Sequence, residues 1–139
     1  MDTPNSFIQK VQNAVVHLIL RAPCHQHCTP LLQQLHWLPM SERIKYKTAC
    51  MCYNSITGSA PSYLSELLQL YIPSRSLLSS SDTHILKLRR FNRKTHGFLS
   101  FSYFGPHIWN NLTQYVRHTN SPPSFKNKLR TFLFSEHFN

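Results

Sequence analysis

Apolar residues recur every three or four positions near both ends of the chain, a spacing typical of amphipathic helices. We expect the first helix to begin at Asn5 or Ser6 and to end at about Leu20. Ser121 is a suitable cap for the last helix, with Pro122 at its first position. The apolar positions that we expect to face the core are Phe7, Ile8, Val11, Val15, Leu18 and Ile19 in the first helix and Phe125, Leu129, Phe132 and Leu133 in the last.

The segments between these ends also carry helical signals. We expect a short apolar turn over residues 31–38, helices over 41–56 and 61–70, and an aromatic helical segment over 98–112 that is interrupted at Gly105-Pro106. The inward residues of the 61–70 helix would be Tyr63, Leu64, Leu67 and Leu68. Residues 84–96 fit either an irregular strand or a basic loop. The predicted fold is therefore mainly α: a small helical domain with an irregular basic loop or short hairpin in its second half.

The charge of the chain is unevenly distributed. The chain has fifteen Lys and Arg residues and five Asp and Glu residues, which gives a formal charge of +10. Residues 83–135 hold nine of these cations and no acid. We therefore divide the chain into a near-neutral helical half (1–73), a Ser-rich linker (74–82) and a basic, aromatic half (83–139). Together they would form one cooperative domain or a partly ordered fragment. Such a charge balance favours nucleic acid or another anionic surface as partner.

The scarcity of acids argues against an enzyme. Polymerases and nucleases that hold two metal ions need clustered carboxylates. The five acids are all more than ten residues apart, and three glycines are too few for a phosphate-binding loop. We expect no catalytic residues, no cofactor, no metal and no small-molecule substrate. The acids are Asp2, Glu42, Glu66, Asp82 and Glu136.

A run of five cations in eight residues is the strongest functional signal. The basic run consists of Lys87, Arg89, Arg90, Arg93 and Lys94, with Phe91 between them. Lys and Arg side chains bind phosphates without reading base sequence, so the run is our candidate nucleic-acid-binding site. The alternatives are a solvated basic loop and a patch resembling a nuclear-import signal. Phe91 would pack in the core or stack on one base.

Cysteine and histidine residues could suggest a metal site or a nucleophile. Cys24, His25, His27 and Cys28, with Cys50 and Cys52, are all zinc-ligand types. Adjacent Cys-His pairs, however, cannot all point at one tetrahedral ion, so we interpret residues 24–28 as a reduced polar loop. We interpret Cys50 and Cys52 as small apolar residues rather than as a nucleophile paired with a distant His.

The two tryptophans could pack in a core or stack on bases. Trp37 and Trp109 both lie among apolar residues. Large aromatics at helical spacing usually pack inside, with the indole N–H bonded locally, and we expect this of both residues. We also expect the first and last helices to share one core with these two segments.

No stretch of the chain predicts a membrane span. The longest apolar run, residues 14–20, is broken by His17 and falls far short of the ~20 residues that a span requires. It also lacks the features of a signal peptide. We therefore expect an intracellular protein, cytoplasmic or nuclear, with reduced cysteines and no membrane partner.

Six strings within residues 9–134 resemble one known family. Over nearly its whole length the chain is similar to the C-terminal segment, downstream of the reverse transcriptase core, of polyproteins encoded by non-LTR (LINE-type) retrotransposons. The strings stand in the family's order and at its spacing. They are VQNAV (11–15), TPLLQQLHWLPMSERIKYKTAC (29–50), APSYLSELL (60–68), PSRSLLSSS (73–81), SFSYFGPHIWNNL (100–112) and SFKNKLRTFLF (124–134).

The resemblance implies a fragment without the family's catalytic parts. Reverse transcription in that family depends on an aspartate pair in a Tyr-x-Asp-Asp turn, which this chain lacks. We therefore expect a non-catalytic, retrotransposon-derived protein that binds RNA or DNA weakly and without sequence preference. One alternative is a helical interaction module that packs on a reverse transcriptase body through an exposed apolar face. The other is an open reading frame with no selected function.

Overall fold

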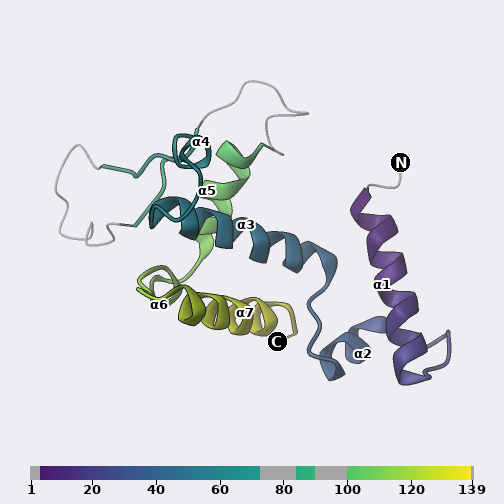
Figure 1. Cartoon of the computed structure of the whole chain (residues 1–139). Helices are drawn as coiled ribbons and strands as arrows, with labels where there is room; N and C mark the ends of the chain where they lie inside the picture. The colour runs from purple at the N-terminus through teal and green to yellow at the C-terminus, as the bar shows by residue number, and fades with distance from the viewer. Residues whose placement is uncertain (1–3, 73–83, 90–99, 139) are drawn as a thin grey trace. The chain divides into compact units, whose positions relative to one another are not determined.

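A computed structural model of the chain describes residues 4–72, 84–89 and 100–138 (Figure 1). About two thirds of these residues are helical and none forms a strand, which confirms the prediction of a mainly α fold. Two extended segments within the described residues meet in an isolated antiparallel bridge between Leu70 and Leu86. The helices of the described residues are α1 (Pro4–Leu20), α2 (Cys28–Gln34), α3 (Met40–Ile56), α4 (Ser62–Ser65), α5 (Phe101–Asn111), α6 (Gln114–Arg117) and α7 (Pro122–Phe138).

The chain divides into two compact units. Unit 1 comprises residues 1–46 and 130–139, and unit 2 comprises residues 47–129. Helices α3 and α7 therefore contribute residues to both units. Unit 2 draws on residues from both sides of the expected linker. Residues 74–82 themselves lie outside the described residues, and a linker there remains a prediction.

The core of unit 1 is small and lies between α1 and α2. Val16 of α1 packs with Leu31 and Leu32 of α2, and none of the three is more than 4 % exposed. The residues that complete this cluster are partly buried: Leu20, Ala22, Leu35, Trp37 and Phe138. Trp37 thus packs against a core, as predicted, and Phe138 brings the end of α7 to the same cluster.

Two glutamines on the same face of α1 as Val16 bond the connection between α2 and α3. The Nε2 of Gln12 donates to the Leu38 carbonyl at 2.9 Å, and the backbone N–H of Met40 donates to Oε1 of Gln9 at 2.8 Å. These bonds satisfy backbone groups of the connection between α2 and α3, which an apolar side chain could not do. Gln9, Gln12 and Val16 share one helix face, so that face is turned inward.

The predicted core stripe of α1 therefore faces outward, and the prediction for these residues is wrong. Every one of them is exposed, from 39 % for Val15 to 80 % for Leu18. The 3.6-residue period located the helix correctly but not the face that is buried. The exposed residues are Phe7, Ile8, Val11, Val15, Leu18 and Ile19, which we call the α1 stripe.

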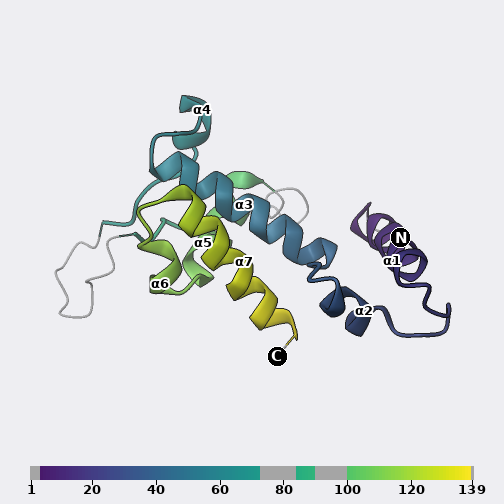
Figure 2. The same cartoon turned by 60° about the horizontal axis from the view of Figure 1, so that its bottom comes forward.

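The core of unit 2 is built around stacked aromatic rings. Tyr53 of α3 stacks on Phe125 of α7 with 4.2 Å between ring centroids, and the ring of Trp109 lies 5.9 Å from that of Phe125. The Tyr53 hydroxyl donates to the Thr119 carbonyl at 3.0 Å. Within unit 2, α3 and α7 lie side by side in both views (Figures 1 and 2).

The apolar stripe predicted for the last helix is confirmed. Phe125, Leu129 and Leu133 are each no more than 2 % exposed, and Phe132 is half-buried. The cations Lys126 and Arg130 are exposed beside the stripe. Of the two tryptophans, Trp37 belongs to unit 1 and Trp109 to unit 2, and one core that contains both remains a prediction.

The helix predicted over 61–70 is only one turn long. Helix α4 ends at Ser65, and of its four expected inward residues Tyr63 is 64 % and Leu67 36 % exposed. The following chain is extended because residues 69–71 pair with residues 85–87. The sequence Leu70-Tyr71-Ile72 before Pro73 is a strand signal that the helical interpretation overlooked.

Helix α5 continues through the expected interruption at Gly105-Pro106. Pro106 removes one helical hydrogen bond, a loss of about 3 kcal/mol in an exposed helix. Here Pro106 lies inside the continuous helix and is fully buried. A Cβ on Gly105 would lie 3.0 Å from the Cys52 Sγ, so the missing side chain lets α5 approach α3 closely.

Candidate nucleic-acid interface

The basic run begins in an extended segment, residues 84–89, that is attached to the body of unit 2. Lys87 and Arg89 lie in this segment and both are exposed. The other three predicted site residues, Arg90, Arg93 and Lys94, lie outside the described residues, as does Phe91. The structure therefore describes the first part of the candidate site and what holds it in place.

One edge of the segment pairs with residues 69–71. The N–H of Tyr71 donates to the Ile85 carbonyl at 2.8 Å, and the N–H of Lys87 donates to the Gln69 carbonyl at 2.7 Å. These two bonds flank the antiparallel bridge between Leu70 and Leu86, which therefore form a non-hydrogen-bonded pair. The N–H and carbonyl of Leu86 therefore point away from residues 69–71, toward the other edge of the segment.

Asn110 of α5 occupies that opposite edge. The N–H of Leu86 donates to Oδ1 of Asn110 at 2.9 Å, and Nδ2 of Asn110 donates to the Leu86 carbonyl at 2.8 Å. The side-chain amide of Asn110 thus makes the two hydrogen bonds that a neighbouring strand would make with Leu86. Next to it, Nε1 of Trp109 donates to the His84 carbonyl at 2.7 Å. The segment is fixed from both edges, and Leu86 is only 2 % exposed.

Trp109 therefore has a structural role. Its side chain is 1 % exposed, and its indole N–H is bonded locally. Both features confirm the predicted core position and leave no face of the ring for a base. No sequence signal indicates the role of Asn110, because an Asn inside an aromatic helix can serve many purposes.

Most of the positive charge of the chain belongs to unit 2. Residues 47–129 hold ten of the fifteen cations and two of the five acids. Of the two acids, Glu66 is exposed and Asp82 lies outside the described residues. The charge excess is therefore a property of the unit that carries the basic run.

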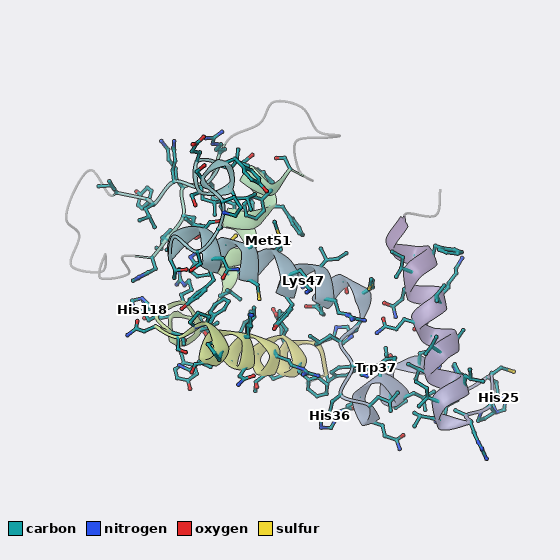
Figure 3. All side chains as sticks on the ribbon, in the orientation of Figure 1. His25, His36, Trp37, Lys47, Met51 and His118 are labelled. Carbon is teal, nitrogen blue, oxygen red and sulfur yellow. The ribbon has the colours of Figure 1, made fainter. Side chains whose placement is uncertain are left out.

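The other cations of unit 2 differ in their availability to a ligand. Arg117 is only 8 % exposed, so it cannot extend the surface of the basic run. The ammonium of Lys128 lies over the Tyr115 ring, 3.9 Å from its centroid. His118 lies at the end of α6 (Figure 3). It packs edge-on against His84 with 4.6 Å between ring centroids. Lys126 is exposed.

The cysteines and histidines are spread over the two units. In unit 1, Cys24 and His25 (Figure 3) are exposed in the loop between α1 and α2. The Cys28 Sγ lies 3.3 Å from His17 Nε2. In unit 2, Cys52 is buried, and burial, with a smaller effect of Cys50, raises the pKa of its thiol to about 12. Among the described residues, no three His, Cys, Asp or Glu side chains gather as metal ligands would.

No helix in the described part of the chain is long and apolar enough to cross a membrane. Comparison of the chain with models of known protein families, with curated proteins and with solved structures finds no match.

Proposed function

We propose that unit 2 binds RNA or DNA without reading base sequence, through the cations of the basic run. The observation that carries the proposal is the attachment of residues 84–87 to α5 and to residues 69–71. Because the buried Leu86 fixes the strand register, Lys87 projects from the opposite face into solvent. A fixed backbone beneath mobile cationic side chains is well suited to contacting phosphates.

The charge of unit 2 supports the same function. Its large excess of cations over acids creates a field that draws a polyanion toward it. Binding of this kind is dominated by release of counterions from the phosphates, so it is weak at physiological salt and does not distinguish sequences.

We also propose that the protein is non-catalytic, intracellular and derived from the C-terminal segment of a non-LTR retrotransposon polyprotein. The support is the six strings described above and the wide separation of the acids in the sequence. Glu42, which is 6 % exposed, is paired with Lys45 at 2.9 Å and is thereby engaged in a structural contact. Primer extension on an RNA template by the purified chain would contradict this proposal.

The test of nucleic-acid binding compares two triple variants of the full chain. Arg89→Ser, Arg90→Ser and Arg93→Ser together should weaken binding of any RNA or DNA and flatten its salt dependence. The control replaces Lys10, Arg21 and Arg43, three exposed cations of unit 1, with Ser. Both variants lose the same formal charge. Equal loss of affinity in the two variants would show that net charge, rather than the basic run, is responsible.

A second candidate function is supported by the α1 stripe. Six large apolar side chains on one helix face are exposed, and the glutamine contacts of α1 hold them outward. Exposed apolar surface of this kind marks interaction sites. The resemblance suggests a reverse transcriptase body as the partner. Leu18→Asp should then abolish binding to the polymerase core of such a polyprotein, whereas Lys126→Asp in α7 should not.

A further inference from the structure

We propose that the preferred ligand of unit 2 is single-stranded nucleic acid, and that Tyr71 stacks on one of its bases beside Lys87 and Arg89. This inference rests on the proposed nucleic-acid binding and adds the form of the ligand. The residues that carry it, Tyr71, Lys87 and Arg89, all belong to the described part of the chain.

The register of the bridge places Tyr71 and Lys87 on one face. Leu70 is opposite Leu86, so Tyr71 is opposite Ile85 and Gln69 is opposite Lys87. Side chains of directly opposed residues point to the same face, and successive side chains alternate. Tyr71 and Lys87 are therefore diagonal neighbours, on the face away from the buried Leu86.

The side chains of Tyr71 and Lys87 are both accessible to solvent on this face. Tyr71 is 51 % exposed, and Lys87 is exposed beside it. Diagonal neighbours in an antiparallel pair are about 7–8 Å apart, a distance that a lysine side chain spans. A base stacked on Tyr71 would thus have its flanking phosphate within reach of the Lys87 ammonium. Arg89, two residues further along and also exposed, would meet the next phosphate.

An exposed aromatic ring next to cations favours a single strand. Stacking on aromatic side chains is the main non-electrostatic contribution to sequence-independent single-strand binding, because every base has a π-face. In a duplex the faces of the bases are covered by their neighbours, so only the phosphates remain available to Lys87 and Arg89. The same surface would therefore hold a duplex more weakly than a single strand.

The other exposed tyrosines of unit 2, Tyr63 and Tyr115, do not combine a free ring face with neighbouring cations that could bind phosphates. The Tyr115 ring is already covered on one face by the Lys128 ammonium. Tyr63 lies on α4, whose C-terminal neighbour Glu66 is an acid that repels phosphate. Tyr63 is 64 % exposed, close to the exposure of Tyr71, and provides a matched control.

The test measures fluorescence anisotropy of a labelled single-stranded RNA of about 15 nucleotides and of the duplex of the same sequence, with the full chain. Tyr71→Leu should weaken single-strand binding roughly 5- to 150-fold, the effect of losing one stacked base, and leave duplex binding unchanged. Tyr71→Phe keeps the ring and should bind like the wild type. Tyr63→Leu should also bind like the wild type.

The inference is overturned if Tyr71→Leu binds the single strand as tightly as the wild type, or if it loses single-strand and duplex binding equally. Crosslinking of the wild type to an RNA with 5-iodouridine gives a second readout that needs no variant. The crosslinked peptide should contain Tyr71, and crosslinks confined to other residues would contradict the inference. If the wild type binds neither RNA at low salt, the proposed nucleic-acid binding fails as well. If it binds the duplex as tightly as the single strand, only the preference for a single strand is contradicted, and the proposed function stands.

Discussion

The side-chain amide of Asn110 bonds both backbone polar groups of Leu86, donating to its carbonyl at 2.8 Å and accepting from its N–H at 2.9 Å. A single side chain thereby takes the place of a β-strand at one edge of the segment that leads into the basic run. The other edge is paired with residues 69–71. The position of Lys87 consequently depends on a residue more than twenty positions away in the sequence.

Replacing Asn110 with Ala should release this segment. The buried backbone groups of Leu86 would lose both partners, which costs about 1–3 kcal/mol for each group left unsatisfied. Hydrogen exchange of the Leu86 amide should accelerate, and the free energy of unfolding should fall. Asn111→Ala, at the exposed neighbouring position, is the control and should change neither quantity. Unaltered exchange at Leu86 in the Asn110 variant would show that the amide does not hold the segment.

Leu129 is fully buried in the predicted stripe of α7, so its truncation should be costly. Leu129→Ala should lower the free energy of unfolding by about 2–5 kcal/mol, because the deletion leaves a cavity. Leu67→Ala makes the same change at a site that is 36 % exposed and should cost less. Denaturant titration of both variants tests this, and an unchanged midpoint for Leu129→Ala would remove the residue from the core.

Two adjacent valines of α1 test which face of that helix is buried. Val16 is fully buried and Val15 is 39 % exposed. Val16→Ala should therefore lower the unfolding free energy by about 1–3 kcal/mol, and Val15→Ala should lower it by much less. The reverse order of effects would mean that the α1 stripe is packed in the folded protein.

The Cys52 thiol should be inert in the folded protein. Its pKa is raised to about 12 from an ordinary value of 9.0, so at pH 8 it holds its proton and reacts slowly with alkylating agents. The exposed Cys24 should react rapidly under the same conditions. Mass spectrometry after iodoacetamide treatment distinguishes the two sites, and equal labelling of Cys24 and Cys52 would contradict the burial.

The same pKa shift predicts a loss of stability in alkali. Because the pKa of Cys52 is higher in the folded state than in the unfolded state, the unfolded chain releases its proton first as the pH rises. The stabilising contribution is complete below about pH 9 and is lost as the pH rises toward 12. Cys52→Ala should flatten this decline, whereas Cys24→Ala should leave it unchanged.

The sequence predicts helices well where local signals agree. The ends of α3 are an example: Glu42 stands in its first turn, and Gly58, with φ +73°, terminates it while the Ser59 N–H bonds the Asn54 carbonyl at 2.8 Å. This is the arrangement that a glycine after a helix favours. Such signals depend on residues close together in the sequence, and they determine the residues at which a helix begins and ends.

What the sequence could not predict depends on distant partners. The outward rotation of α1 follows from bonds between its glutamines and residues 38 and 40, which no periodicity reveals. Similarly, residues 69–71 are extended because residues 85–87 pair with them, and Asn110 holds the segment that carries Lys87 and Arg89. The composition of the candidate site could be predicted from the charges, but its attachment could not.

The salt dependence of RNA binding by the full chain tests the central claim most directly. If the basic run makes about four to five phosphate contacts, log K against log salt should fall with a slope of roughly −3 to −4.5. The variant with Arg89, Arg90 and Arg93 replaced by Ser should show a flatter slope and lower affinity for every RNA and DNA tested. A wild-type slope near zero, or the same slope and affinity in the triple variant, would contradict the claim that the basic run binds nucleic acid.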